Sequence, residues 1–214
     1  MKKTLIGLAL AMTFSVASAL PVTGSIDSGT GGGMYATASW GHGDAELSWR
    51  VSESGGIWTY VYHWVTESKA LSHIIFGVSD TFTSGNILSG TTSGWELGTW
   101  SSAQGNSNVG IPGPLYGLKF GGNDTDETFI IVSDRAPMCG KFYAKDGKDG
   151  GDDVYAFNSA YSNGMIDCLS SGNFEGYVLV PDTKTTNRVP EPGTMALLGV
   201  GMIGLMLRKK SASA

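Results

Sequence analysis

Four aspartates crowd a short glycine-rich stretch, and their carboxylates are candidate ligands for a metal ion. Oxygen ligands on a flexible loop suit calcium. The stretch lacks EF-hand spacing, because Lys148 and Gly150 take the third and fifth positions counted from Asp146. A solvated turn rich in Asp and Gly is the favoured alternative. We therefore expect no bound cofactor, with calcium as the competing hypothesis at Asp146, Asp149, Asp152 and Asp153.

A second candidate site is a run of alternating aromatic residues between positions 57 and 65. Successive side chains of a strand point to opposite faces, so these rings share one face. An exposed aromatic face can stack on sugar rings, whereas an inward one fills the core, and we favour the core. The glycan-stacking hypothesis concerns Trp58, Tyr60, Tyr62 and Trp64.

Catalytic motifs are absent from the sequence. It contains no Gly-x-Ser-x-Gly, no His-Glu-x-x-His, no phosphate loop and no dinucleotide fingerprint. His63 and His73 lie on predicted strands that could pair, but two histidines without a third ligand make a poor metal site. We predict a protein that is not an enzyme. The alternative is a glycoside hydrolase whose carboxylate pair comes together only in the fold.

The elements that must position these residues are predicted to be strands. Clean alternation over residues 45–51 places Ala45, Leu47, Trp49 and Val51 on a buried face. Residues 71–78 are apolar on both faces, as in a central strand. The segment 20–180 is therefore predicted to be all-β, an antiparallel, jelly-roll-like β-sandwich. Further strands are expected at residues 57–65, 95–100, 115–120, 128–133, 141–145, 154–157 and 175–180, and residues 181–188 are expected to be a linker.

The body of the chain is acidic. Residues 20–188 hold 9 lysines and arginines against 18 aspartates and glutamates, so their formal net charge is −9. An acidic body argues against nucleic acid and anionic lipid as partners. Neutral glycans, or anionic glycans bridged by cations, are compatible with this charge.

The N-terminus has the parts of a secretory signal peptide in their usual order. Lys2 and Lys3 precede an apolar run over residues 5–16, and small residues follow at Ala17 and Ala19. The run is too short to span a bilayer comfortably. We predict that residues 1–19 are removed by signal peptidase after Ala19.

The C-terminus has a comparable order of parts. Residues 189–194 contain two prolines around a glutamate, residues 195–207 carry no charge, and residues 208–210 are basic. The uncharged stretch predicts a short transmembrane helix. By the positive-inside rule its basic end should stay in the cytoplasm, leaving residues 20–188 outside the inner membrane.

This C-terminal arrangement resembles the PEP-CTERM sorting signal over residues 189–210. Such signals occur on surface and matrix proteins of Gram-negative bacteria that make exopolysaccharide. The resemblance implies that exosortase, a membrane-embedded transpeptidase-like enzyme, recognises Pro190, Glu191 and Pro192 and removes the tail. It also implies transient anchoring in the inner membrane, followed by a cell-surface or extracellular location.

The chain has two cysteines, Cys139 and Cys168, and the expected export decides how they are interpreted. They are expected to form an intramolecular disulfide, because exported proteins fold in an oxidising compartment and neither residue lies in a Cys-x-x-Cys motif. Taken together, the sequence predicts an exported, exosortase-sorted surface or biofilm-matrix protein. Its β domain is expected to be a non-catalytic binding or structural module associated with exopolysaccharide.

Overall fold

The computed structural model describes residues 20–169, 172 and 174–181. The predicted signal peptide, the PEP-CTERM segment with its helix, and linker residues 182–188 lie outside the described residues. The described part forms strands joined by short 3-10 helices η1 (Ala38–Trp40), η2 (Ser84–Asn86) and η3 (Ser102–Asn108). The strands are β1 (Val22–Asp27), β2 (Met34–Ala36), β3 (Ala45–Ser54), β4 (Ile57–Thr66), β5 (His73–Gly77), β6 (Glu96–Trp100), β7 (Leu115–Gly121), β8 (Asp126–Ser133), β9 (Pro137–Gly140), β10 (Phe142–Asp149), β11 (Asp152–Asn158) and β12 (Val178–Pro181).

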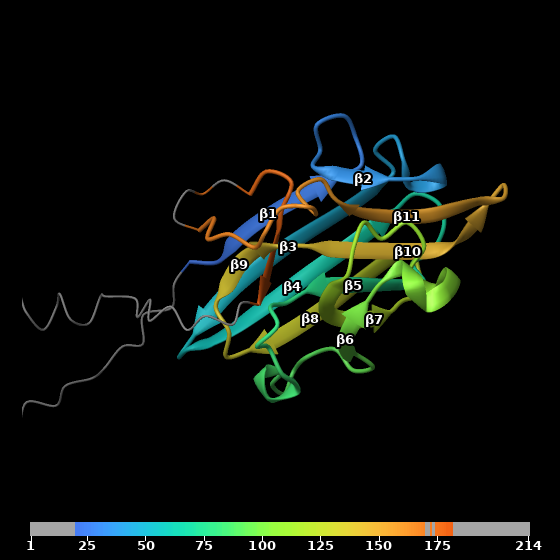
Figure 1. Cartoon of the computed structure of the whole chain (residues 1–214). Helices are drawn as coiled ribbons and strands as arrows, with labels where there is room; N and C mark the ends of the chain where they lie inside the picture. The colour runs from blue at the N-terminus through green and yellow to red at the C-terminus, as the bar shows by residue number, and fades with distance from the viewer. Residues whose placement is uncertain (1–19, 170–171, 173, 182–214) are drawn as a thin grey trace, which may run out of the picture.

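These strands form antiparallel sheets, which confirms the all-β prediction (Figure 1). A four-stranded sheet has the order β1-β3-β4-β8, and a six-stranded sheet has the order β2-β11-β10-β5-β7-β6. A third sheet consists of β12 and β9. The six-stranded sheet brings together strands that are far apart in the sequence, since β2 lies beside β11 and β5 lies between β10 and β7.

The β3–β4 hairpin follows directly from the sequence. Its turn is Gly55-Gly56, and both glycines have positive φ, at 61° and 83°. Two-residue hairpin turns of the type that matches strand twist require this conformation at both positions, and glycine adopts it without steric cost. The alternating residues of β3 predicted to be buried are buried.

The strand positions predicted from the sequence were confirmed for most elements, including β6 in the long segment between residues 79 and 114. Three strands were missed, namely β1, β2 and β9. β1 shows little apolar alternation, β2 has three residues, and β9 begins at Pro137. β12 begins at Val178 rather than at residue 175, because a turn with Gly176 at φ 70° precedes it. Pro181, assigned to the linker from sequence, is the last residue of β12.

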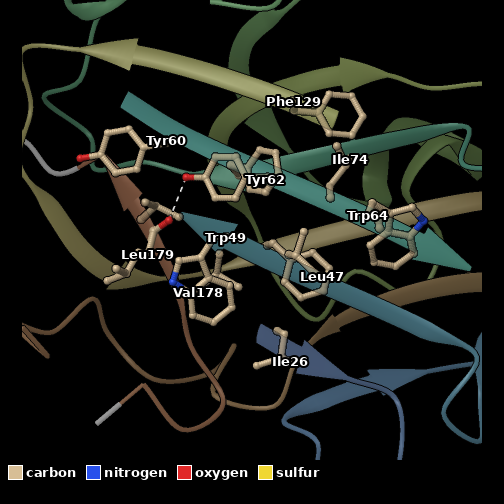
Figure 2. Packing of buried hydrophobic residues seen from close by; sticks show 14 of the residues in the cluster. Ile26, Leu47, Trp49, Tyr60, Tyr62, Trp64, Ile74, Phe129, Val178 and Leu179 are labelled. Atoms are coloured by element: carbon tan, nitrogen blue, oxygen red, sulfur yellow. Dashed lines mark hydrogen bonds between the residues drawn. The ribbon is translucent and has the colours of Figure 1, made fainter. Parts of the chain in front are cut away.

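The core lies where the four-stranded and six-stranded sheets meet. Tyr62 of β4 stacks on Phe76 of β5 with ring centroids 3.8 Å apart, and Phe76 also contacts the edge of Phe129 from β8. Figure 2 shows side chains from β1, β3, β4, β5, β8 and β12 converging on this cluster. Each sheet therefore buries one face in the same core. The opposite face of the six-stranded sheet carries a second, smaller buried cluster, which consists of Ile75, Ile111, Leu115, Tyr143 and Tyr161.

Candidate functional site

The aromatic run of β4 lies in the core, not on the surface. Tyr60, Tyr62 and Trp64 are fully buried, and Trp58 at the end of the strand is half-buried. The Tyr62 hydroxyl donates a 2.8 Å hydrogen bond to the carbonyl oxygen of Leu179, and burial raises the pKa of Tyr62 well above its ordinary value (Figure 2). These three rings cannot reach a sugar, so the glycan-stacking hypothesis is wrong for them and the core alternative holds.

The aspartate-rich stretch forms the hairpin between β10 and β11. Its turn is Gly150-Gly151, and Asp149 lies opposite Asp152 in the strand register. Asp153 instead faces Lys148, whose ammonium is 3.7 Å from the carboxylate. Within residues 20–169, 172 and 174–181, no three His, Cys, Asp or Glu side chains gather closely enough to hold a metal ion. The stretch is thus a hairpin with a Gly150-Gly151 turn, and calcium binding there stays a prediction.

The two histidines considered as metal ligands lie on different sheets. His63 is on β4 of the four-stranded sheet, and His73 is on β5 of the six-stranded sheet, so the expectation that their strands could pair is wrong. The His63 ring is 2.7 Å from the Asp126 carboxylate on the protein surface. His73 is buried, and its Nε2 lies 3.1 Å from Oδ1 of Asn108.

Burial, reinforced by the positive charge of Lys119, lowers the pKa of His73 from 6.5 to about 4. Above pH 6.5 the ring is neutral in both states, so it contributes no pH dependence there. Below that pH the unfolded chain takes up a proton that the folded protein does not, and the protein loses stability.

We therefore expect the free energy of unfolding to fall by about 3 kcal/mol as the pH decreases from about 6.5 to about 4. Urea unfolding across this range measures the loss. The His73→Gln variant keeps a side-chain donor for Asn108 but no longer titrates, so it should show a correspondingly smaller loss. Parallel pH profiles for the two proteins would contradict the assignment.

The predicted disulfide between Cys139 and Cys168 is present. Cys139 belongs to β9, and Cys168 lies within the connection between β11 and β12. Backbone hydrogen bonds in both directions between Cys139 and Ile166 hold the same loop against β9. The bond thus fastens the two-stranded β9–β12 sheet to the loop beside it.

One surface of chemical interest was missed from the sequence. It is the outer face of the six-stranded sheet, where Tyr35 of β2 stacks on Phe157 of β11 with ring centroids 4.8 Å apart. Phe157 in turn stacks on Tyr155 at 6.3 Å, and its ring meets the edge of Tyr161. Tyr35 is 50% exposed, whereas Tyr155 and Phe157 are half-buried. We call Tyr35, Tyr155 and Phe157 the aromatic ladder.

Strand register places lysines beside the aromatic ladder. Lys145 of β10 lies directly opposite Tyr155, and residues opposite each other in a sheet share a face. Lys141 lies over the ring of Tyr161, 5.1 Å from its centroid. Further along the same face, Lys119 of β7 lies over Trp100 of β6 at 4.7 Å. The sequence does show that Tyr143 and Lys145 are two positions apart, as are Tyr155 and Phe157, so each pair shares a face of its own strand. It does not show that the two strands are neighbours with these pairs on the same face of one sheet.

The segment between β6 and β7 covers the middle of this face (Figure 1). The hydroxyl of Tyr143 donates a 2.6 Å hydrogen bond to the carbonyl oxygen of Val109, and His73 bonds Asn108 from the same segment. Gly110 has a φ of 75° and lies against the Tyr155 ring so closely that a Cβ atom would collide with it. The segment thereby fixes the ring of Tyr155 and leaves Tyr35 at the sheet edge uncovered.

Comparison with known proteins identifies the C-terminus. Residues 188–210 match the family model of the PEP-CTERM protein-sorting motif. No curated protein and no solved structure matches the chain. Among the helices that the structure describes, none is long and apolar enough to cross a membrane. The motif marks the chain for export and sorting by exosortase to the cell surface or the extracellular space.

Proposed function

We propose that this chain is a non-catalytic cell-surface or matrix protein that associates with the exopolysaccharide of the bacterium that produces it. In this proposal its body is an antiparallel, jelly-roll-like β-sandwich, and its C-terminal helix anchors it transiently in the inner membrane until exosortase removes the tail. Signal peptidase removes residues 1–19. The observation that carries the proposal is the PEP-CTERM motif at residues 188–210.

The body has properties that suit this destination. A disulfide forms and persists in oxidising compartments, so the Cys139–Cys168 bond fits a domain that folds after export. The edge of the four-stranded sheet at β8 is covered by the segment that precedes β6, since the amides of Leu88 and Thr92 bond carbonyl oxygens of that strand. Covered edges limit pairing between copies, which favours a domain that stays soluble at a crowded surface.

The proposal is tested by fractionating the producing bacterium into inner membrane, surface polymer and medium. Wild-type protein is expected in the polymer fraction, with the mass of a chain that has lost both ends. A variant with Pro190, Glu191 and Pro192 all replaced by alanine should remain in the membrane fraction at the higher mass of the unprocessed tail.

Polymer association, sorting, calcium dependence and the absence of catalysis are each tested by a separate outcome. Wild-type protein free in the medium would refute the association with polymer, whereas equal processing of the triple variant would refute sorting through the motif. Retention in the polymer fraction after EDTA treatment would show that the association needs no calcium. Reducing ends released from the polymer by purified protein would refute the non-catalytic assignment.

A further inference from the structure

The aromatic ladder presents one exposed ring, that of Tyr35, next to two half-buried rings that pack against the second buried cluster of this face. Tyr35 and Phe157 are stacked with an angle of 27° between their planes, and Tyr155 and Phe157 with an angle of 10°. The three rings form a continuous row over β2 and β11. Sugar rings present C–H groups that pack on an exposed aromatic ring such as that of Tyr35, whose hydroxyl can also hydrogen-bond to sugar oxygens.

Three lysines on this face lack ionic partners. Among the described residues, no carboxylate lies within ion-pair distance of Lys119, Lys141 or Lys145. Two of these ammonium groups lie over aromatic rings, which orients them without neutralising them. Their positive charge is therefore available to an anionic ligand.

The charge of this face contrasts with the rest of the molecule. Four of the seven lysines and arginines between residues 20 and 181 lie on it, namely Lys119, Lys141, Lys145 and Lys148. The acidic side chains that register places with them are Asp153, which pairs with Lys148, and Glu96, which lies opposite Lys119. Because the whole body is acidic, a locally positive face orients an approaching anion towards this sheet.

We propose that the outer face of the six-stranded sheet binds an anionic glycan, in which a sugar ring packs on the exposed ring of Tyr35 and acidic groups pair with the lysines of this face. This rests on the proposed association with exopolysaccharide and specifies the surface and the charge of the polymer. Because the lysines contact the acidic groups of the glycan directly, no cation is needed to bridge the glycan to the acidic protein. Aromatic stacking supplies the sugar preference, and the ammonium groups supply the charge preference.

The test uses processed protein purified from the producing cells and two matched polymers, polygalacturonate and its methyl ester. Affinity gel electrophoresis should show binding to the acidic form that is at least about fivefold tighter than to the uncharged ester, because several exposed charge pairs are lost in the ester. Raising sodium chloride from about 0.05 to about 0.5 M should weaken binding to the acidic form through screening.

Variants locate the binding surface. Lys145→Gln should weaken binding to polygalacturonate about two- to fivefold, as expected for one exposed charge pair. Tyr35→Ala removes an exposed ring from an edge strand and should weaken binding to both polymers about two- to tenfold. The matched controls lie on the four-stranded sheet, where Arg50→Gln removes an exposed charge and Ile57→Ala an exposed apolar side chain. Neither control should change binding.

Equal binding to the two polymers, unchanged binding by Lys145→Gln and Tyr35→Ala, or binding only to vesicles of anionic phospholipid would each overturn the inference. These outcomes are separable from a failure of the proposed function. Protein that joins the producer's own polymer but ignores polygalacturonate overturns the inference alone. Protein that binds polygalacturonate through this face but does not join the producer's polymer overturns the proposed function alone.

Discussion

Replacing Trp64 by alanine is expected to lower the free energy of unfolding by about 3 to 5 kcal/mol, the range for removing a large buried aromatic ring. The Trp64 side chain is fully buried and meets the edge of the Trp40 ring at a centroid distance of 5.0 Å. It also contacts Phe142 of the opposite sheet. Alanine would leave a cavity between the two sheets that rigid strands cannot close.

Urea denaturation of the processed protein measures this loss, with circular dichroism as the signal. Trp58→Ala is the matched control, because it removes the same ring from the same face of β4 at a half-buried position. We expect the control to lose less than half as much stability as Trp64→Ala. A loss below about 1 kcal/mol for Trp64→Ala would show that this ring is not in the core. Equal losses for the two variants would contradict the difference in burial between Trp58 and Trp64.

Removing the disulfide is expected to cost about 3 to 4 kcal/mol of unfolding free energy. The two cysteines are separated by 29 positions, and the chain-entropy model gives a value of this size for a loop of about that length. The variant in which both Cys139 and Cys168 are replaced by alanine should therefore unfold at a markedly lower urea concentration than the oxidised wild-type protein.

A reducing agent supplies the control for this prediction. Dithiothreitol should lower the urea midpoint of the wild-type protein towards that of the double variant and should leave the double variant unchanged. If reduction did not change the wild-type midpoint, the cysteines would not be linked in the exported protein. If the double variant were as stable as the oxidised protein, the bond would not stabilise the fold.

Local patterns in the sequence were sufficient to predict the features of this protein that depend on residues close together in the chain. The PEP-CTERM motif could be recognised because its recognition depends on the order of a few adjacent residues. The β3–β4 hairpin was predictable for the same reason, since alternating apolar residues lead into a Gly55-Gly56 turn. The disulfide needed only the pairing of two cysteines in an exported chain.

Which face of a strand is buried could be decided only from the tertiary structure. Alternation showed that the rings of β4 share a face, but only packing against Phe76 and Leu179 decided that this face is the inner one. Likewise, the pairing of strands could not be inferred from strand patterns alone. His63 and His73 are ten residues apart in the sequence, and yet they belong to different sheets.

The position of the aromatic ladder and the lysines on one face could be seen only in the folded structure. Tyr35, Lys119 and Phe157 come from strands separated by long stretches of sequence, and only the order β2-β11-β10-β5-β7 places them on one face. Sequence by itself determined where the chain is sent and that its body is made of strands, because sorting motifs and strand periodicity are local properties. The tertiary structure decided which side chains meet water, because burial depends on contacts between distant segments.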